Sequence, residues 1–298
     1  MRVHAYRCIA LLVLCVGDLS AGAWTLPKGV AWTKLSYFSQ QTREWYSAHR
    51  QWVAGEIVDP GVRTRYNFEG RYDSHAAFFE AVYGASERLD IGVQIPYFAQ
   101  RYADQTRDQS LSATGLGDVR ATVKLRLVER PLVFAVQGGV KMPTGDFRNV
   151  DGLIPVGEGQ WDVDVAFAAG RSFWPRALYA NAEGGYRLRR TNGQIDRDPG
   201  DEWFCSAEVG GRLTPRVRLM GKFELLHGGP AREFGGIVNR SQIKRIRYAA
   251  AVVYLDISAR TALEAGARFS LGGRNYPAGT QWIVALTRDW RVGAEKGE

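Results

Sequence analysis

The chain has 298 residues, and its 39 Lys and Arg against 31 Asp and Glu give a formal net charge of +8. A basic balance can serve nucleic-acid binding, but the amino-terminal residues are typical of a secreted chain, so anionic lipid or anionic solutes are the more natural partners and we expect no nucleic acid. The length favours one large β domain over two, and no segment after the amino terminus is apolar enough to form a membrane helix.

The first 23 residues predict a cleaved signal peptide. Arg2 and Arg7 flank the start of a short apolar run from Cys8 to Val16, and Ala21-Gly22-Ala23 fits the small-residue cleavage rule. The mature chain is then 24–298. Cleavage removes two of the three cysteines and leaves Cys205, which cannot form an intramolecular disulfide and which we interpret as a lipid-facing residue.

Apolar and polar residues alternate in many segments of the mature chain. From Asp118 to Leu127 every second residue is apolar, and from Trp161 to Phe167 Asp162 and Asp164 share the polar face. Successive side chains of a strand point to opposite faces, so this period of two separates an apolar face from an ionic one. Repeated in a secreted chain, the pattern predicts an all-β fold, a transmembrane antiparallel up-and-down β-barrel. A periplasmic sandwich or a lipocalin-like barrel is the alternative.

Alternation and turn residues predict about twelve strands. They run near 28–40, 66–84, 88–102, 115–128, 131–143, 160–173, 176–190, 202–213, 216–227, 244–256, 261–271 and 280–290. Tight turns alternate with long links, as expected when turns lie in the periplasm and loops lie outside. The even count places both termini in the periplasm. The polar tail after Trp290 leaves open where the last strand ends.

Aromatic residues at strand ends support the membrane location. We expect an outer belt of Trp161, Trp203 and Trp282 and an inner belt of Tyr83, Phe173, Tyr254 and Trp290, because such rings prefer the membrane interface. The location implies contact with outer-membrane lipid, with lipopolysaccharide and with the machinery that assembles outer-membrane barrels.

Several turn motifs resemble a known family. Thr114-Gly115-Leu116-Gly117-Asp118, the run from Val140 to Asp146, the run from Val156 to Asp162 and the run from Ser270 to Asn275 resemble outer-membrane proteins grouped under the phenol meta-pathway name. They are also similar to a related group found beside extracellular polysaccharide functions. The resemblance implies a bacterial outer-membrane barrel of the transporter type, and it carries no catalytic residues.

The polar faces of the strands define the candidate site, the lumen of the barrel. The predicted inward residues are Arg120, Lys124, Lys141, Arg187, Arg212, Lys222, Arg247, Arg268, Asp162, Asp164, Glu183 and Glu208. Their basic excess predicts a narrow channel for small anionic or polar solutes. The alternative is a network of buried ion pairs that fills the barrel.

No pattern indicates an enzyme, a cofactor or a metal site. His49, His75 and His227 lie in different segments, and Ser74 beside His75 points to the opposite face of its strand, which weighs against a lipid hydrolase. Asp196, Asp198, Asp201 and Glu202 lack the spacing of a calcium loop. A structural or adhesive barrel stays open, because Trp45, Tyr46, His49, Arg50 and Trp52 gather in the first outer loop. Such a loop can bind sugar rings or fold over the mouth of the barrel.

Overall fold

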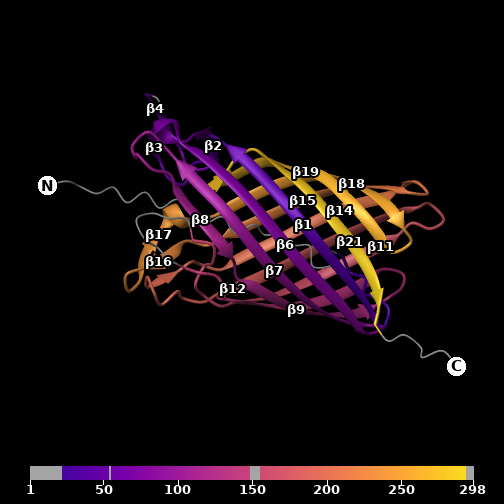
Figure 1. The fold of residues 1–298 in the computed structure, drawn as a ribbon. Coiled ribbons are helices and arrows are strands. Elements are labelled where there is room, and N and C mark those ends of the chain that lie inside the picture. The colour runs from indigo at the N-terminus through magenta and orange to yellow at the C-terminus, as the bar shows by residue number, and fades with distance from the viewer. Residues whose placement is uncertain (1–21, 54, 148–154, 293–298) are drawn as a thin grey trace.

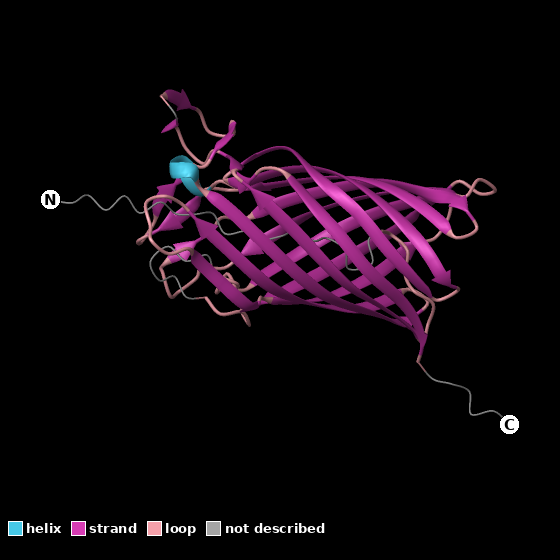
Figure 2. Ribbon diagram, turned by 45° about the horizontal axis from the view of Figure 1, so that its top comes forward, coloured by secondary structure: helices cyan, strands magenta, loops and turns pink. Residues whose placement is uncertain are grey.

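The structure, a computed structural model, describes residues 22–53, 55–147 and 155–292. In these residues one antiparallel sheet closes on itself, because β6 (Arg71–Ser86) and β7 (Leu89–Ala103) pair with each other as well as with their other neighbours. The tilted strands form a continuous wall in which the first and last strands lie side by side (Figures 1 and 2). The other wall strands are β1 (Val30–Thr42), β8 (Leu111–Leu116), β9 (Val119–Val128), β10 (Val133–Met142), β11 (Asp162–Ser172), β12 (Leu178–Arg189), β14 (Glu202–Thr214), β15 (Val217–Gly228), β18 (Arg245–Ser258), β19 (Thr261–Arg274) and β21 (Thr280–Arg291).

Strands β8 and β9 are two halves of one wall strand, since both pair with β7. The break falls at Gly117, where a Cβ atom would lie 2.5 Å from the ring of Phe98. Glycine therefore allows β7 to pass close to the break. With the halves taken together, the barrel has the twelve antiparallel strands that alternation predicts. This strand begins at Leu111, earlier than the expected residue 115.

The connections differ between the two ends of the barrel. Where β1 begins and β21 ends, neighbouring strands are joined by turns of two to five residues. The opposite end carries the longer connections, so we assign it to the extracellular side. One connection departs from the expected alternation of short and long, because β19 and β21 are joined by only five residues at the extracellular end.

The extracellular connections contain short elements of their own. No helix in the described part of the chain is long and apolar enough to cross a membrane. These elements are β2 (Glu44–Tyr46), β3 (Gln51–Val53), β4 (Glu56–Val58), β5 (Arg63–Arg65), the 3-10 turn η1 (Asn67–Glu69), β13 (Arg197–Asp198), β16 (Ala231–Glu233), β17 (Ile237–Asn239), the 3-10 turn η2 (Arg240–Gln242) and β20 (Tyr276–Pro277).

Inward and outward side chains alternate along the wall. On β9, Val123 is 49% exposed while its neighbours Thr122 and Lys124 are buried. On β11, Phe167 is 64% exposed while Ala166 is buried. A continuous exposed apolar surface on a closed sheet is the membrane-facing surface of a barrel, and the buried polar residues face the lumen.

The expected interface aromatics lie on this outer surface with one exception. Trp161, Trp203 and Trp282 are exposed at the extracellular end. Tyr83, Phe173 and Trp290 are exposed at the periplasmic end. Tyr254 points inward, and the Arg218 guanidinium lies 4.8 Å from its ring centroid.

Strand β18 has its faces reversed relative to the expectation. Ile246, Tyr248 and Val252 are buried, whereas Arg247 is exposed on the outer surface. The expectation of an inward Arg247 and an outward Tyr254 is therefore wrong in both cases for one reason. Both faces of this strand carry apolar residues, so alternation does not decide which face is inside, and a shift of one residue exchanges them.

Candidate functional site in the lumen

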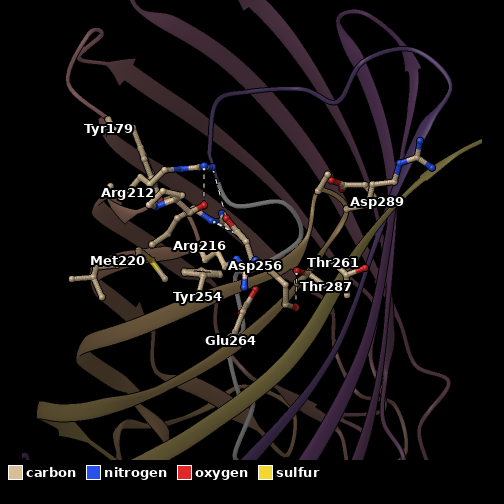
Figure 3. A pocket seen from close by; sticks show the side chains of 18 of the residues that line it. Tyr179, Arg212, Arg216, Met220, Tyr254, Asp256, Thr261, Glu264, Thr287 and Asp289 are labelled. Carbon is tan, nitrogen blue, oxygen red and sulfur yellow. Dashed lines mark hydrogen bonds and ion pairs between the residues drawn. The ribbon is translucent and has the colours of Figure 1, made fainter.

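A cavity of about 1200 Å³ occupies the periplasmic part of the lumen, and we call it the vestibule. Its wall includes inward residues of β12, β14, β15, β18 and β19, and Figure 3 shows Arg212, Tyr254 and Asp256 pointing into it. The Asp256 carboxylate lies 2.7 Å from Arg218 and 3.7 Å from Arg212. The vestibule is thus a polar chamber with charges of both signs.

A segment before the first strand occupies the bore beside the vestibule. The backbone N–H of Leu26 donates to the Asp90 carboxylate at 3.0 Å, and Leu26 also lines the vestibule. The Trp24 ring meets Tyr179 edge to face, with centroids 6.0 Å apart. A Cβ atom on Gly170 would lie 2.7 Å from the Trp24 ring. If cleavage follows Ala23 as expected, residues 24–27 remain in the mature chain, and we call them the inner segment.

Ion pairs bridge alternate strands in the middle of the bore. Arg120 on β9 contacts Asp164 on β11 at 2.5 Å, above Gly139 of the intervening strand β10. A Cβ atom on Gly139 would lie 2.8 Å from the Arg120 guanidinium. In the same way Arg268 on β19 reaches Glu224 on β15 at 2.5 Å, across β18. The inward charges are therefore mutually neutralised across the wall rather than directed at an empty channel.

The connection between β10 and β11 adds a buried acid to this network. Glu158 forms an ion pair with Lys141 and another with Arg189, at 2.5 Å in the second case. Burial raises the pKa of the Glu158 carboxyl, but Arg189 and Lys141 outweigh burial and hold that pKa below its usual range. Glu158 therefore stays ionised at neutral pH and ties the connection to the wall. Arg189 also contacts Glu202 at 3.2 Å, and Glu202 contacts Arg187 at 2.8 Å.

The opposite side of the extracellular half is aromatic. Phe38 and Phe78 meet edge to face with centroids 5.3 Å apart, and Phe78 meets Phe98 in the same way at 5.7 Å. Tyr248 and Tyr276 join the same buried cluster. Sequence reasoning missed this cluster because β6 carries aromatic residues on both faces, with Phe78 inward and Phe79 outward. The extracellular half of the lumen thus has an ionic side and an aromatic side.

The structure brings most of the predicted inward residues into the lumen. Arg247, on the outer surface, is the exception. The residues on inward positions are Arg120, Lys124, Lys141, Arg187, Arg212, Lys222, Arg268, Asp162, Asp164, Glu183 and Glu208.

The lumen contains more acidic residues than the sequence pattern collected. Glu80 and Asp90 are buried on the inward faces of β6 and β7, and Glu158, Glu202 and Asp256 join the ion pairs described above. With these acids and the inward Arg189 and Arg218 included and Arg247 removed, bases no longer outnumber acids. The charges of the lumen do not by themselves favour an anion.

Other candidate residues lie apart from one another. Ser74 is buried on the inward side of β6, while His75 points outward and its ring shares a 2.7 Å hydrogen bond with the Tyr37 hydroxyl. Cys205 is half-buried on the outward face of β14. Asp201 accepts a hydrogen bond from the backbone N–H of Arg189 at 2.9 Å. In the described ranges, no three His, Cys, Asp or Glu residues are placed to hold a metal ion.

Comparisons with known proteins agree with the barrel. The family model described as "Putative MetA-pathway of phenol degradation" matches residues 54–284. A solved outer-membrane channel from Pseudomonas putida F1 is 16% identical with a TM-score of 0.73, over 90% of this chain and 98% of that chain. The β domain of a Bordetella autotransporter is 11% identical with a TM-score of 0.49, over 88% and 100% of the two chains. The Pseudomonas putida toluene transporter TodX is 8% identical with a TM-score of 0.44, over 95% of each chain. No curated protein matches the sequence.

The family match spans most of the chain and agrees with the turn motifs that resemble this group. The closed twelve-stranded wall, its apolar outer face and its charged lumen are those of a bacterial outer-membrane protein. The chain therefore belongs to the family described as a putative MetA-pathway of phenol degradation, and it is an outer-membrane β-barrel of that family.

Proposed function

We propose that this protein is a narrow channel for small anionic or polar solutes. The observation that carries the proposal is the vestibule, a cavity of about 1200 Å³ inside a closed wall, lined by charged side chains and leading toward the ionic network. A barrel that served only as a scaffold would not need a polar chamber of this size. Beyond the vestibule, the inner ion pairs and the aromatic cluster narrow the bore.

The ionic side and the aromatic side of the extracellular half of the lumen suit a solute that has both polar groups and a ring. Arg187 and Arg189 lie on the ionic side, where they pair with Glu202 and Glu158, and a carboxylate or hydroxyl group of a solute would compete with these acids for their hydrogen bonds. Tyr72 and Tyr248 lie on the aromatic side. A small ring compound that carries a carboxylate or several hydroxyl groups would match both sides, as an aromatic acid or a short oligosaccharide does.

Charge substitutions in planar bilayers test the proposal. Arg120→Ser with Arg187→Ser removes the partners of Asp164 and Glu202, so selectivity should move toward cations. The matched variant Asp164→Asn with Glu202→Gln should move it toward anions. We expect each to change the permeability ratio by about tenfold, equivalent to about 1.4 kcal/mol. The reversal potential under a salt gradient measures the shift, and high salt should reduce it by screening.

The bilayer recordings also separate transport from its alternatives. If the native protein and both variants are silent while the barrel is folded, transport is excluded and an adhesive or structural role is the better conclusion. Shifts in the same direction for the two variants would show that these pairs do not line the ion path. Turnover of lipid by the native protein would instead support a hydrolase.

One observation favours adhesion as a second candidate. The hairpin of β3 and β4 stands away from the barrel rim (Figure 1), and Trp52 on it is 66% exposed. Two other aromatics of the same loop fold over the mouth: Tyr46 is buried, and Trp45 stacks on Tyr66 with centroids 5.6 Å apart. The hairpin therefore presents an aromatic side chain to partners outside the cell, as the exposed Phe234 does on another extracellular connection.

Substitution of Trp52 tests this candidate. If the hairpin binds sugar rings, Trp52→Ser should lower retention of the detergent-solubilised protein on immobilised acidic polysaccharide by roughly fivefold, equivalent to about 1 kcal/mol. Trp174→Ser is the control, because Trp174 is exposed at the periplasmic end. Equal retention of both variants and the native protein would exclude this surface.

A further inference from the structure

Three arginines gather on the outer surface of the barrel, at the extracellular ends of β18 and β19. Arg245, Arg247 and Arg274 line a hollow of about 230 Å³ together with backbone of two glycines and of the first outer loop. Arg245 pairs directly with Arg274 across the two strands, and Arg247 pairs with Gly272. We call this hollow the arginine site.

A β-bulge creates the site. Tyr248 pairs with Ser270 and Arg247 pairs with Gly272, so Leu271 is an extra residue on β19. The extra residue reverses which side chains of β19 face outward beyond it, and this places Arg274 on the same face as Arg245. The Arg247 side chain lies over Gly272, since a Cβ atom there would be in ordinary contact with its Cδ, at 3.6 Å.

The positive charges of the site have no counterion among the described residues. In the portion of the chain that the structure describes, none of the three arginines forms an ion pair. Arg274 donates to the carbonyl oxygens of Ala48 at 3.1 Å and Arg240 at 2.8 Å, which hold its side chain in place without neutralising it. Like charges placed directly opposite each other destabilise a sheet. An anion bound from outside would remove this repulsion.

The site lies at the depth of the lipid headgroups. Trp203, His227, Arg245 and Arg274 follow one another in register on four neighbouring strands. The exposed Trp203 ring stacks on His227 with centroids 5.4 Å apart, and indole rings prefer the membrane interface. Trp282, on the other side of β18 and β19, is in register with Ala251, so the belt of exposed indoles crosses the tilted strand β18 between Arg245 and Ala251. The arginines therefore lie just above this belt, at the level of the headgroups of the outer leaflet.

Below the arginines the outer face of the wall is apolar and forms a shallow depression. Ala249 lies in register between Phe223 and Phe269, so a small side chain separates two large ones on the outer face. Ala251 continues this row of small residues toward the middle of the membrane. An acyl chain can lie in such a depression when its headgroup is held above it.

We propose that the arginine site binds a phosphate group of the outer-leaflet glycolipid, the lipid A part of lipopolysaccharide. Guanidinium groups match phosphate oxygens with paired charge-assisted hydrogen bonds, and several arginines can share one phosphate. The acyl chains of the same molecule lie along the apolar wall below. Free phosphate has the same headgroup chemistry but would gain nothing from that wall.

Binding of defined lipids to the detergent-solubilised full barrel tests the proposal. The probes are lipid A with both phosphates, lipid A with its phosphates removed, and inorganic phosphate. The test variant is Arg245→Ser with Arg247→Ser. Its control is Arg88→Ser with Arg130→Ser, which removes the same charge from exposed periplasmic turns. Native mass spectrometry counts bound lipid, and the shift of the unboiled barrel on SDS gels shows that each variant is folded.

We expect the native barrel and the control to retain phosphorylated lipid A, and the test variant to bind it roughly thirtyfold more weakly, from about 1 kcal/mol for each arginine near an anionic surface. Removal of the phosphates should weaken binding to the native barrel to a similar degree. Equal loss in the test variant and the control would show that only net charge matters and would overturn the site. Inorganic phosphate binding as tightly as lipid A would overturn the lipid assignment.

Discussion

At the scale of single residues, each wall position meets one of two environments. Val123 faces lipid, whereas Thr122 and Lys124 beside it are buried in the lumen. The same type of side chain therefore has opposite effects at neighbouring positions. A charge is stabilised inward, where ion pairs accept it, and costs free energy outward, where only acyl chains surround it.

Substitution of Val123 measures this difference. Val123→Arg should lower the free energy of unfolding by about 2–4 kcal/mol, the cost of a basic residue near the middle of the membrane. Urea unfolding of the barrel in lipid vesicles gives the value. Val123→Leu is the control and should stay close to the native protein, because it keeps the position apolar. A small effect of the arginine would place Val123 near an interface or in the lumen.

At the scale of elements, the success of sequence reasoning depends on how different the two faces of a strand are. The ionic face of β9 is free of large apolar residues, so alternation identified Arg120 and Lys124 as inward. On β18, Tyr248 and Val253 make both faces apolar, and alternation could not choose between them. Alternation could not predict the positions of loop residues, because a period of two says nothing about where a connection folds. For this reason Glu158 could not be placed in the lumen.

The inner segment lies inside the bore, where its side chains take up space. Trp24 fills the space above Gly170 and against Tyr179. Trp24→Ala should widen the periplasmic part of the lumen and raise single-channel conductance, by roughly twofold if the ring obstructs the narrowest section. Planar-bilayer recordings measure the change. Trp282→Ala, on the outer surface of the barrel, is the control and should leave the conductance unchanged. Equal conductance of both variants would place the narrowest section elsewhere.

At the scale of the whole molecule, closure of the sheet is the dominant feature. β1 pairs with β21 along its length, from Val30 opposite Arg291 to Ser39 opposite Trp282. Each wall strand except β8, which pairs with β7 alone, thus has hydrogen-bonded neighbours on both sides, so closure removes most of the exposed edge. Closure also makes local opening costly, because one strand cannot leave without breaking two ladders.

This closure predicts resistance to detergent. The folded protein should migrate at a different apparent mass on SDS gels before and after boiling, because the closed barrel stays compact in detergent until heat separates its strands. Extraction with the soluble periplasmic fraction in the absence of detergent would contradict the membrane barrel.

The position of the inner segment bears on the affinity for a solute as well as on the width of the bore. It is covalently joined to β1 and rests against the vestibule, so it acts as a tethered competitor for any solute that needs the same space. A tether of a few residues keeps the local concentration of such a competitor in the millimolar range or above. If cleavage follows Ala23, a solute that enters this space would have to displace the inner segment, and its apparent affinity would be lower than its contacts with the wall alone would give. Weak, rapidly reversible binding is what a channel requires, and the inner segment would favour it.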